Sequence, residues 1–192
     1  MIERLVALDV ALFQVLNGRL HTPVLDAVMR AVTTQDNWYV VLLGIWVALI
    51  IWGGRRGRLA AVMLVVAVAL ADQASCSLMK PTFARLRPPN ALDAECVRLI
   101  VGGSKAFSFP SAHAANSFAM ATVATWLNRR LAPLFLGVAA LVAYSRVYVG
   151  LHYPLDIVAG ALLGAGLGWV SIRLVLGVER WWKRRRAAAL GR

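Results

Sequence analysis

Residues Ser145 to Asp156 read S-R-V-Y-V-G-L-H-Y-P-L-D and connect two long apolar runs. The stretch contains an arginine, a histidine and a carboxylate: Arg146, His152 and Asp156. Ionisable side chains at the edge of a bilayer are costly unless they pair with one another or bind a ligand. We therefore expect the rest of the chain to supply partners for these residues and to hold them at a membrane surface.

The composition is typical of a membrane protein. Of the 192 residues, 60% are hydrophobic, and the mean hydropathy is +0.67, whereas apolar residues make up only about half of a soluble domain. The net charge of +12 falls in short clusters between apolar runs, a pattern that follows the positive-inside rule and argues against nucleic acid binding. The two cysteines, Cys76 and Cys96, predict neither a metal cluster nor a disulfide framework. They could pair only if the loop after residue 80 faces an oxidising compartment.

Hydropathy predicts an all-α integral membrane bundle. The segment that precedes the predicted spans, residues 5–33, is expected to form two short helices in or near the membrane interface; the alternative is one additional, tilted span. The bundle therefore has five or six transmembrane helices. The predicted spans are residues 37–52, 59–79, 111–127, 131–149 and 155–178.

We expect one domain with three parts. Residues 1–36 form the N-terminal interfacial helices, residues 37–178 the transmembrane core that carries the site, and residues 179–192 a basic cytoplasmic tail. In the last span, glycines recur every four residues, which predicts a small-residue face for close helix packing within the monomer or in a homodimer. These glycines are Gly160, Gly164 and Gly168.

The basic clusters orient the bundle. With five spans, the cluster around Arg55, the pair Arg129-Arg130 and the basic tail all fall on one side, which should be cytoplasmic. The loop of residues 80–110 and the turn around His152 then face the opposite compartment. Positive charges left on that outer side need a reason, and a bound anion is the simplest one. For Arg85, Arg98 and Lys105, snorkelling to the interface is the alternative.

Three polar groups lie at the outer ends of spans. Because their spans end on the same side, topology alone brings the groups to one membrane face. The first ends the second span, the second opens the third span, and the last bridges the fourth and fifth. In order, they are Lys80 with Arg87-Pro88; Pro110-Ser111-Ala112-His113; and Ser145-Arg146 with His152 and Asp156.

Several of these residues are suited to holding phosphate. Lys80, Arg87 and Arg146 offer a point charge and forked donors that match phosphate oxygens. Ser111 follows a proline and can cap a helix, which leaves the amides of Ala112 and His113 free to donate. A helix N-terminus with a hydroxyl and free amides is a ready anion site.

The remaining residues are suited to nucleophilic catalysis. Pro154 can open a helix, which puts Asp156 in its first turn. From there the carboxylate can accept a hydrogen bond from one nitrogen of His152 and leave the other nitrogen as a nucleophile. His113 remains as the proton donor to a leaving group.

Together the three groups resemble the tripartite signature of the type 2 phosphatidic acid phosphatase (PAP2) superfamily: K-x6-R-P, P-S-G-H and S-R-x5-H-x3-D. The resemblance covers about residues 37–178 and implies an integral-membrane phosphatase that uses no metal or other cofactor and passes through a phosphohistidine. It implies that His152 is the nucleophile, Asp156 its orienting partner and His113 the general acid. The implied phosphate-binding residues are Lys80, Arg87, Ser111, Ala112 and Arg146, with Ser145 in support.

One residue departs from that signature. Ala112 stands where the family usually has glycine. Because φ is negative in the first turn of a helix, alanine is sterically allowed there. The added methyl should narrow the phosphate pocket without abolishing activity.

An N-terminal pattern resembles the bacterial branch of the family that acts on isoprenoid pyrophosphates. The resemblance predicts undecaprenyl pyrophosphate as the substrate, with phosphatidylglycerophosphate, phosphatidate and lipid A phosphate as alternatives. The expected location is the bacterial inner membrane, with the site facing the periplasm or the outside. The residues of the pattern are Leu12, Phe13, Asn17, Gly18, Leu25 and Asp26.

Two other functions were weighed. The vanadium haloperoxidases share the signature, but they are soluble, whereas this chain is membrane-embedded. A lipid transporter would explain the spans but not why three polar groups converge on one face.

Overall fold

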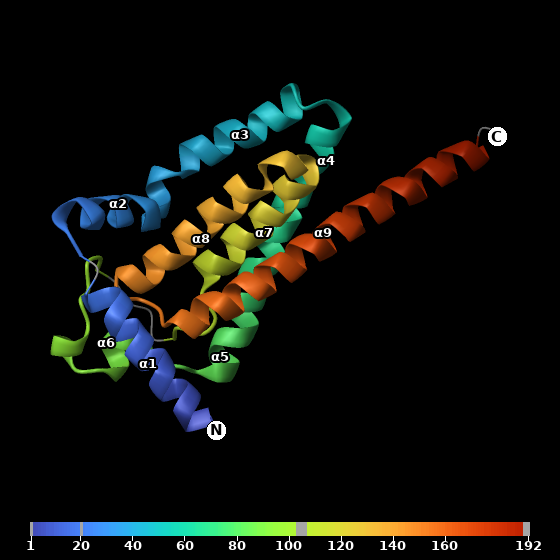
Figure 1. Cartoon of the computed structure of the whole chain (residues 1–192). Helices are drawn as coiled ribbons and strands as arrows, with labels where there is room; N and C mark the ends of the chain where they lie inside the picture. Colours follow the sequence, from blue (N-terminus) through green and yellow to red (C-terminus); the bar gives the residue numbers. More distant parts are fainter. Residues whose placement is uncertain (1, 20, 103–106, 190–192) are drawn as a thin grey trace.

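The structure, a computed structural model, describes residues 2–19, 21–102 and 107–189. Within these ranges every secondary-structure element longer than a single bridge is a helix (Figure 1). This confirms the all-α fold. A π-helical turn, Gln73–Met79, joins α4 to α5. The helices are α1 (Ile2–Gly18), α2 (Pro23–Thr33), α3 (Tyr39–Ile51), α4 (Gly54–Asp72), α5 (Lys80–Phe83), α6 (Pro88–Ala91), α7 (Ala112–Leu127), α8 (Ala132–Tyr148) and α9 (Pro154–Ala189).

Three helical stretches among the described residues are long and apolar enough to cross a membrane: Gly54–Phe83, Arg129–Tyr148 and Pro154–Ala189. The first runs through α4, the π-helical turn and α5, so it continues past residue 79, where the predicted span ends. Two further predicted spans correspond to shorter helices, α3 with 13 residues and α7 with 16 residues. The membrane bundle is therefore confirmed, whereas the count of five or six spans stays a prediction.

Helix α7 lies at the centre of the bundle and packs against α4, α8 and α9. Small residues allow the close approach. A Cβ atom added at Gly164 would lie 2.0 Å from the carbonyl oxygen of Ala115, and one added at Gly160 would lie 2.5 Å from that of Ser111. Gly168 meets Ala119 in the same way. The glycine face predicted for the last span therefore packs inside the monomer, which is one of the two alternatives; the homodimer stays untested.

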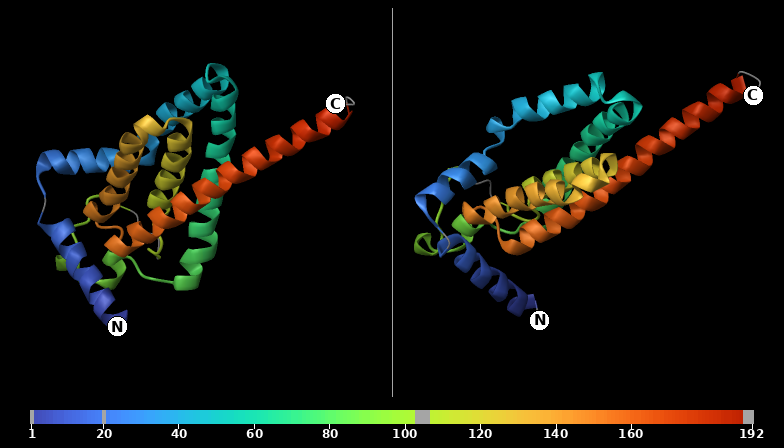
Figure 2. Two further views of the ribbon diagram at one scale, coloured as in Figure 1. Left: turned by 45° about the vertical axis from the view of Figure 1, so that its right-hand side comes forward. Right: turned by 45° about the horizontal axis from the view of Figure 1, so that its top comes forward.

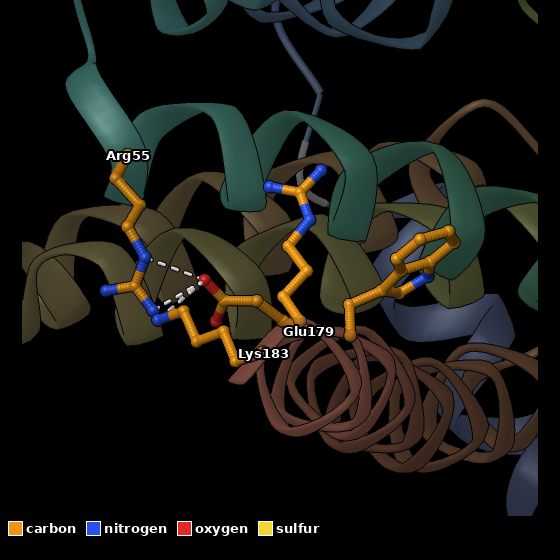
Figure 3. A pocket seen from close by; sticks show the side chains of 5 residues that line it. Arg55, Glu179 and Lys183 are labelled. Atoms are coloured by element: carbon orange, nitrogen blue, oxygen red, sulfur yellow. Dashed lines mark hydrogen bonds and ion pairs between the residues drawn. The ribbon is translucent and has the colours of Figure 1, made fainter. Parts of the chain in front are cut away.

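The segments that carry the predicted basic clusters and the segments that carry the candidate site residues lie at opposite ends of the bundle (Figure 1). The α3–α4 and α7–α8 junctions and the C-terminal end of α9 lie at one end. There Glu179 of α9 pairs with Arg55 of α4 at 2.5 Å and with Lys183 at 3.4 Å (Figure 3). The α8–α9 junction, α5 and α6 lie at the other end. The predicted segregation of basic clusters from candidate site residues is thus present in the fold.

Helix α9 extends beyond the other helices (Figure 2). It has 36 residues, so at about 1.5 Å per residue it is about 54 Å long, well above the roughly 30 Å of a bilayer core. The predicted basic tail is therefore, as far as Ala189, a continuation of the last helix; residues 190–192 lie outside the described ranges.

The N-terminal segment forms two short helices, as predicted, but they do more than lie at an interface. Helix α1 packs against α8 and α9, and α2 packs against α8. Phe13 is fully buried and meets the ring of Tyr153 edge-on at 5.4 Å. The buried amide of Asn17 donates to the carbonyl oxygens of Tyr148 at 2.7 Å and Arg98 at 2.9 Å. These helices therefore hold the outer end of the bundle together.

Candidate active site

The turn between α8 and α9 positions His152. The amide of His152 donates to the carbonyl of Arg146 at 3.2 Å, which closes the turn onto the end of α8. Gly150 has φ of +86°, and a Cβ atom there would lie 2.7 Å from the carbonyl oxygen of Arg98. Only glycine fits this turn without strain. The spacer between Arg146 and His152 is therefore a compact turn pressed against the outer loop.

His152 and Asp156 form a buried pair. The two side chains are 1% and 0% exposed, and Nδ1 of His152 lies 3.4 Å from Oδ2 of Asp156. The same Oδ2 accepts a hydrogen bond from the amide of Tyr153 at 2.9 Å, whereas Nδ1 of His152 forms no hydrogen bond within the described residues. With Nδ1 facing the carboxylate, Nε2 is the nitrogen left with a lone pair. Burial lowers the pKa of His152 to about 4, although Asp156 acts to raise it, so the imidazole is neutral at neutral pH.

The three predicted cationic phosphate ligands surround His113 and are close enough to act on it electrostatically. Arg87 and Arg146 are buried, with 5% and 7% of their surface exposed. Arg146 donates to the hydroxyl of Thr33 at 2.5 Å, and Arg87 donates to the carbonyl of Phe107 at 3.2 Å. Neither of these hydrogen-bond partners carries a charge.

Arg146 also has a buried hydrogen-bond donor that lacks a partner among the described residues. The buried Nε of Arg146 forms no hydrogen bond to any residue that the structure describes. Buried polar atoms normally have partners, so a donor of this kind calls for a ligand or solvent. Lys80 is half-buried at the start of α5, and its ammonium donates to Sγ of Cys76 at 3.8 Å. A cluster of cations that includes a buried donor without a partner among the described residues is suited to a multiply charged anion.

Helix α7 begins at this site. Ser111 is its N-cap, and the Ser111 hydroxyl accepts from the amide of Ala114 at 3.4 Å. The amide of Ser111 donates to the carbonyl of Asp156 at 3.0 Å, which joins the second polar group to the third. Ala112 and His113 follow in the first turn. Ser145 is buried, and its hydroxyl donates to the carbonyl of Val142 within α8 at 2.7 Å.

Sequence reasoning missed the role of Arg85, for which snorkelling or anion binding was expected. Its guanidinium instead bridges two carboxylates, Asp9 at 2.6 Å and Asp156 at 2.8 Å. It also lies over the ring of Tyr153, 4.1 Å from the centroid. The sequence signal that could have found this bridge is Asp9, an isolated carboxylate in the apolar run of residues 5–17.

Arg98 and Lys105 were also expected to snorkel or to bind an anion, and of these two the structure describes Arg98. Arg98, which was given the same two expectations as Arg85, pairs with Asp26 of α2. Asp26 also accepts a hydrogen bond from the hydroxyl of Tyr148 at 2.6 Å. Lys105 lies outside the described residues. Cys76 and Cys96 are both free thiols, so the disulfide that they could form is absent here.

Comparisons with known proteins show the family of the chain. The sequence profile of the PAP2 superfamily matches residues 60–180. A lipid A 4'-phosphatase of Bacteroides thetaiotaomicron is 38% identical over 88% of this chain and 78% of its own length. An undecaprenyl-diphosphatase of Sulfolobus acidocaldarius is 30% identical over 90% of this chain and 81% of its own.

One solved structure is similar in both fold and sequence. The crystal structure of Aquifex aeolicus LpxE superimposes with a TM-score of 0.72 and 29% identity, covering 85% of this chain and 93% of that one. The profile match covers more than half of the chain, and the relatives match nearly its whole length. The chain therefore belongs to the PAP2 superfamily.

Proposed function

We propose that this phosphatase removes phosphate from a membrane lipid in two steps, with His152 as the nucleophile. The observation that carries the proposal is the buried cluster at the outer end of the bundle. It combines a neutral imidazole held beside Asp156, a second imidazole, His113, and three cations around that second imidazole. This set contains a nucleophile, a proton carrier and a charge clamp, which phosphoryl transfer requires.

In the first step, Nε2 of His152 attacks phosphorus while the bond from phosphorus to the leaving oxygen breaks. His113, which must enter this step as the imidazolium, protonates that oxygen, so the lipid leaves as an alcohol, or as a lipid monophosphate where the substrate is a pyrophosphate. The ring of His152 gains positive charge, which Asp156 balances from the Nδ1 side. Lys80, Arg87 and Arg146 bind the equatorial oxygens, where stabilisation of charge is usually the largest contribution to catalysis.

In the second step, water attacks the phosphohistidine. His113 takes the proton from that water, the phosphorus–nitrogen bond breaks, and inorganic phosphate is released. His152 returns to its neutral state. Each imidazole therefore ends the cycle in the protonation state in which it began.

The substrate is a lipid phosphate monoester or pyrophosphate. The sequence pattern at the N-terminus predicted undecaprenyl pyrophosphate, but the relatives do not favour it over lipid A phosphate. The 38% identical relative is a lipid A 4'-phosphatase, whereas the undecaprenyl-diphosphatase is 30% identical. We therefore put lipid A 4'-phosphate first and undecaprenyl pyrophosphate second. Phosphatidylglycerophosphate and phosphatidate complete the panel to be assayed.

The decisive experiment measures phosphate release from these four lipids by purified protein in detergent, with a chelator present. We expect release from at least one lipid, and a loss of more than about a thousandfold in His152→Ala. His21→Ala is the matched control, because His21 lies on the exposed segment before α2 and not in the cluster. Undiminished release by His152→Ala would overturn the mechanism. No release from any lipid would favour a transporter.

A further inference from the structure

A buried chain of charges connects helix α1 to the His152–Asp156 pair. Asp9 of α1 contacts Arg85 at 2.6 Å, and Arg85 contacts Asp156 at 2.8 Å. The Asp9 and Asp156 side chains are 1% and 0% exposed, while that of Arg85 is 22% exposed. Burying charged groups is costly, and the cost is repaid only where ion-pair geometry is good and further hydrogen bonds satisfy the charged atoms. Asp9 lies 146 residues before Leu155, which is in the first turn of the helix that carries Asp156.

Asp9 holds Asp156 in two ways. Its Oδ2 atom fixes one end of the Arg85 guanidinium, whose other end holds Oδ1 of Asp156. Its Oδ1 atom accepts a hydrogen bond from the amide of Leu155 at 2.8 Å, in the first turn of α9. Oδ2 of Asp156 is thereby left for the amide of Tyr153 and for Nδ1 of His152. Both the guanidinium and the backbone that carries Asp156 are tied to α1.

The charges of Asp9, Arg85 and Asp156 are as informative as the distances between them. Arg85 alone with Asp156 would form a neutral pair, with no negative charge left to offset charge on His152. The second carboxylate, Asp9, makes the trio one net negative charge. When the neutral imidazole attacks phosphorus, its ring becomes positive while Nδ1 keeps its proton. A trio with one negative charge balances that ring, and a neutral pair does not.

We propose that Asp9 is a positioning residue for phosphoryl transfer: through Arg85 it keeps Asp156, and hence His152, oriented and charge-balanced for attack. The proposal rests on the proposed function of His152 as nucleophile. It gives α1 a role in the reaction, although α1 contributes no side chain that touches phosphate. The groups that face Asp156 and would share any change are Arg85, His152, Tyr153 and Arg87.

The test compares Asp9→Asn with the unmodified protein. An asparagine keeps an oxygen for the Leu155 amide but loses the charge opposite Arg85. We expect kcat to fall about 10- to 100-fold, the range that follows from slight misplacement of reacting groups. Inhibition by inorganic phosphate should stay within about twofold, because the cations that bind phosphate are untouched. After an alkaline quench, phosphohistidine should form more slowly, which locates the loss in the attack by His152.

Arg85→Lys is the second variant, because an ammonium cannot bridge two carboxylates as a guanidinium fork does. It should reproduce the fall in kcat with unchanged inhibition by phosphate, and it keeps the proposal testable if Asp9→Asn does not fold. The matched control is Asp26→Asn, which breaks the other ion pair between an N-terminal helix and the outer loop, Asp26–Arg98. It should keep kcat within about threefold.

Three results would overturn the proposal: unchanged kcat in both variants, an equal fall in Asp26→Asn, or a loss that appears in phosphate inhibition and not in kcat. Failure of the proposed function is distinguishable, because it would appear first as His152→Ala retaining activity. In that case the Asp9 variants would have no nucleophile on which to act.

Discussion

The pKa of His152 decides when the proposed nucleophile is available. Burial lowers this pKa from 6.5 to about 4, and Asp156 opposes the shift. The neutral imidazole, which attacks phosphorus, therefore persists in mildly acidic solution. Because the folded pKa is the lower one, the unfolded chain binds an extra proton between about pH 6.5 and pH 4. The contribution of His152 to stability is thus complete above pH 6.5 and is lost as the pH falls through that window.

This shift is directly measurable. In the protein with ¹⁵N-labelled histidine, we expect the His152 imidazole to titrate near pH 4 in the absence of substrate, with the signal assigned by its loss in His152→Gln. Asp156→Asn removes the carboxylate that raises this pKa, so it should move the midpoint lower still. A midpoint at or above 6.5 would contradict the buried, neutral imidazole.

Residues differ in how far their roles could be predicted. His152, Asp156, His113, Ser111 and the three cations have types and spacings that carry a chemical meaning on their own. The bridge from Asp9 through Arg85 to Asp156 spans 76 and 71 residues, and a lone aspartate in an apolar run does not reveal which arginine it meets. Thr33, which holds Arg146 from 113 residues away, was missed for the same reason.

At the scale of helices, the packing of α9 on α7 fixes the position of Ser111 and His113 relative to Asp156. The two helices approach so closely at Gly164 that the carbonyl of Ala115 would lie 2.0 Å from an added Cβ. Interfaces of this kind in membranes depend on small residues that let two backbones meet. Ser111 is the N-cap of α7 and His113 lies in its first turn, whereas Asp156 lies in the first turn of α9. Displacing one helix therefore displaces His113, the proposed general acid, relative to Asp156 and the proposed nucleophile, His152.

Gly164→Ala tests this dependence. The added methyl meets backbone and cannot be accommodated by a side-chain rotation. Overpacking of this kind costs about 1–3 kcal/mol, so we expect the apparent Tm in detergent to fall by roughly 5–10 °C and activity to fall with it. The matched control is Gly166→Ala, where nothing lies within 4 Å of an added Cβ, and Tm should be unchanged or slightly higher. Equal effects of the two substitutions would contradict the packing argument.

Elements were predicted better in kind than in extent. Hydropathy located the helices because each needs an apolar stretch, whether it faces lipid or protein. It ended the last helix near Val178, because the residues that follow are charged, yet α9 continues to Ala189. Lysines and arginines are good helix formers, so a helix emerging from a bilayer does not end where its hydrophobicity ends. Nor could hydropathy show that α1 and α2 dock onto the α8–α9 turn.

For the whole molecule, the decisive property is the separation of its two ends. Basic residues belong to the α3–α4 and α7–α8 junctions and to the end of α9; these segments lie opposite the α8–α9 junction, α5 and α6, which carry candidate site residues (Figure 1). If the cations at one end bind phosphate, the positive-inside rule requires the other end to be richer in lysine and arginine. This arrangement followed from the sequence, because alternating spans fix which loops share a side. The number of complete spans did not follow, because α3 and α7 are short.

The resulting orientation is testable with the native thiols. Cys96 is exposed in the outer loop, and Cys76 is half-buried near Lys80. In a Cys76→Ala background, a membrane-impermeant maleimide added to intact spheroplasts should label Cys96. In Cys76→Ala/Cys96→Ala carrying Arg184→Cys, on the exposed end of α9, labelling should require permeabilisation. The reverse pattern would place the site in the cytoplasm and its basic end outside. The enzyme would then act on lipids of the inner leaflet, and the charge argument for the topology would be wrong.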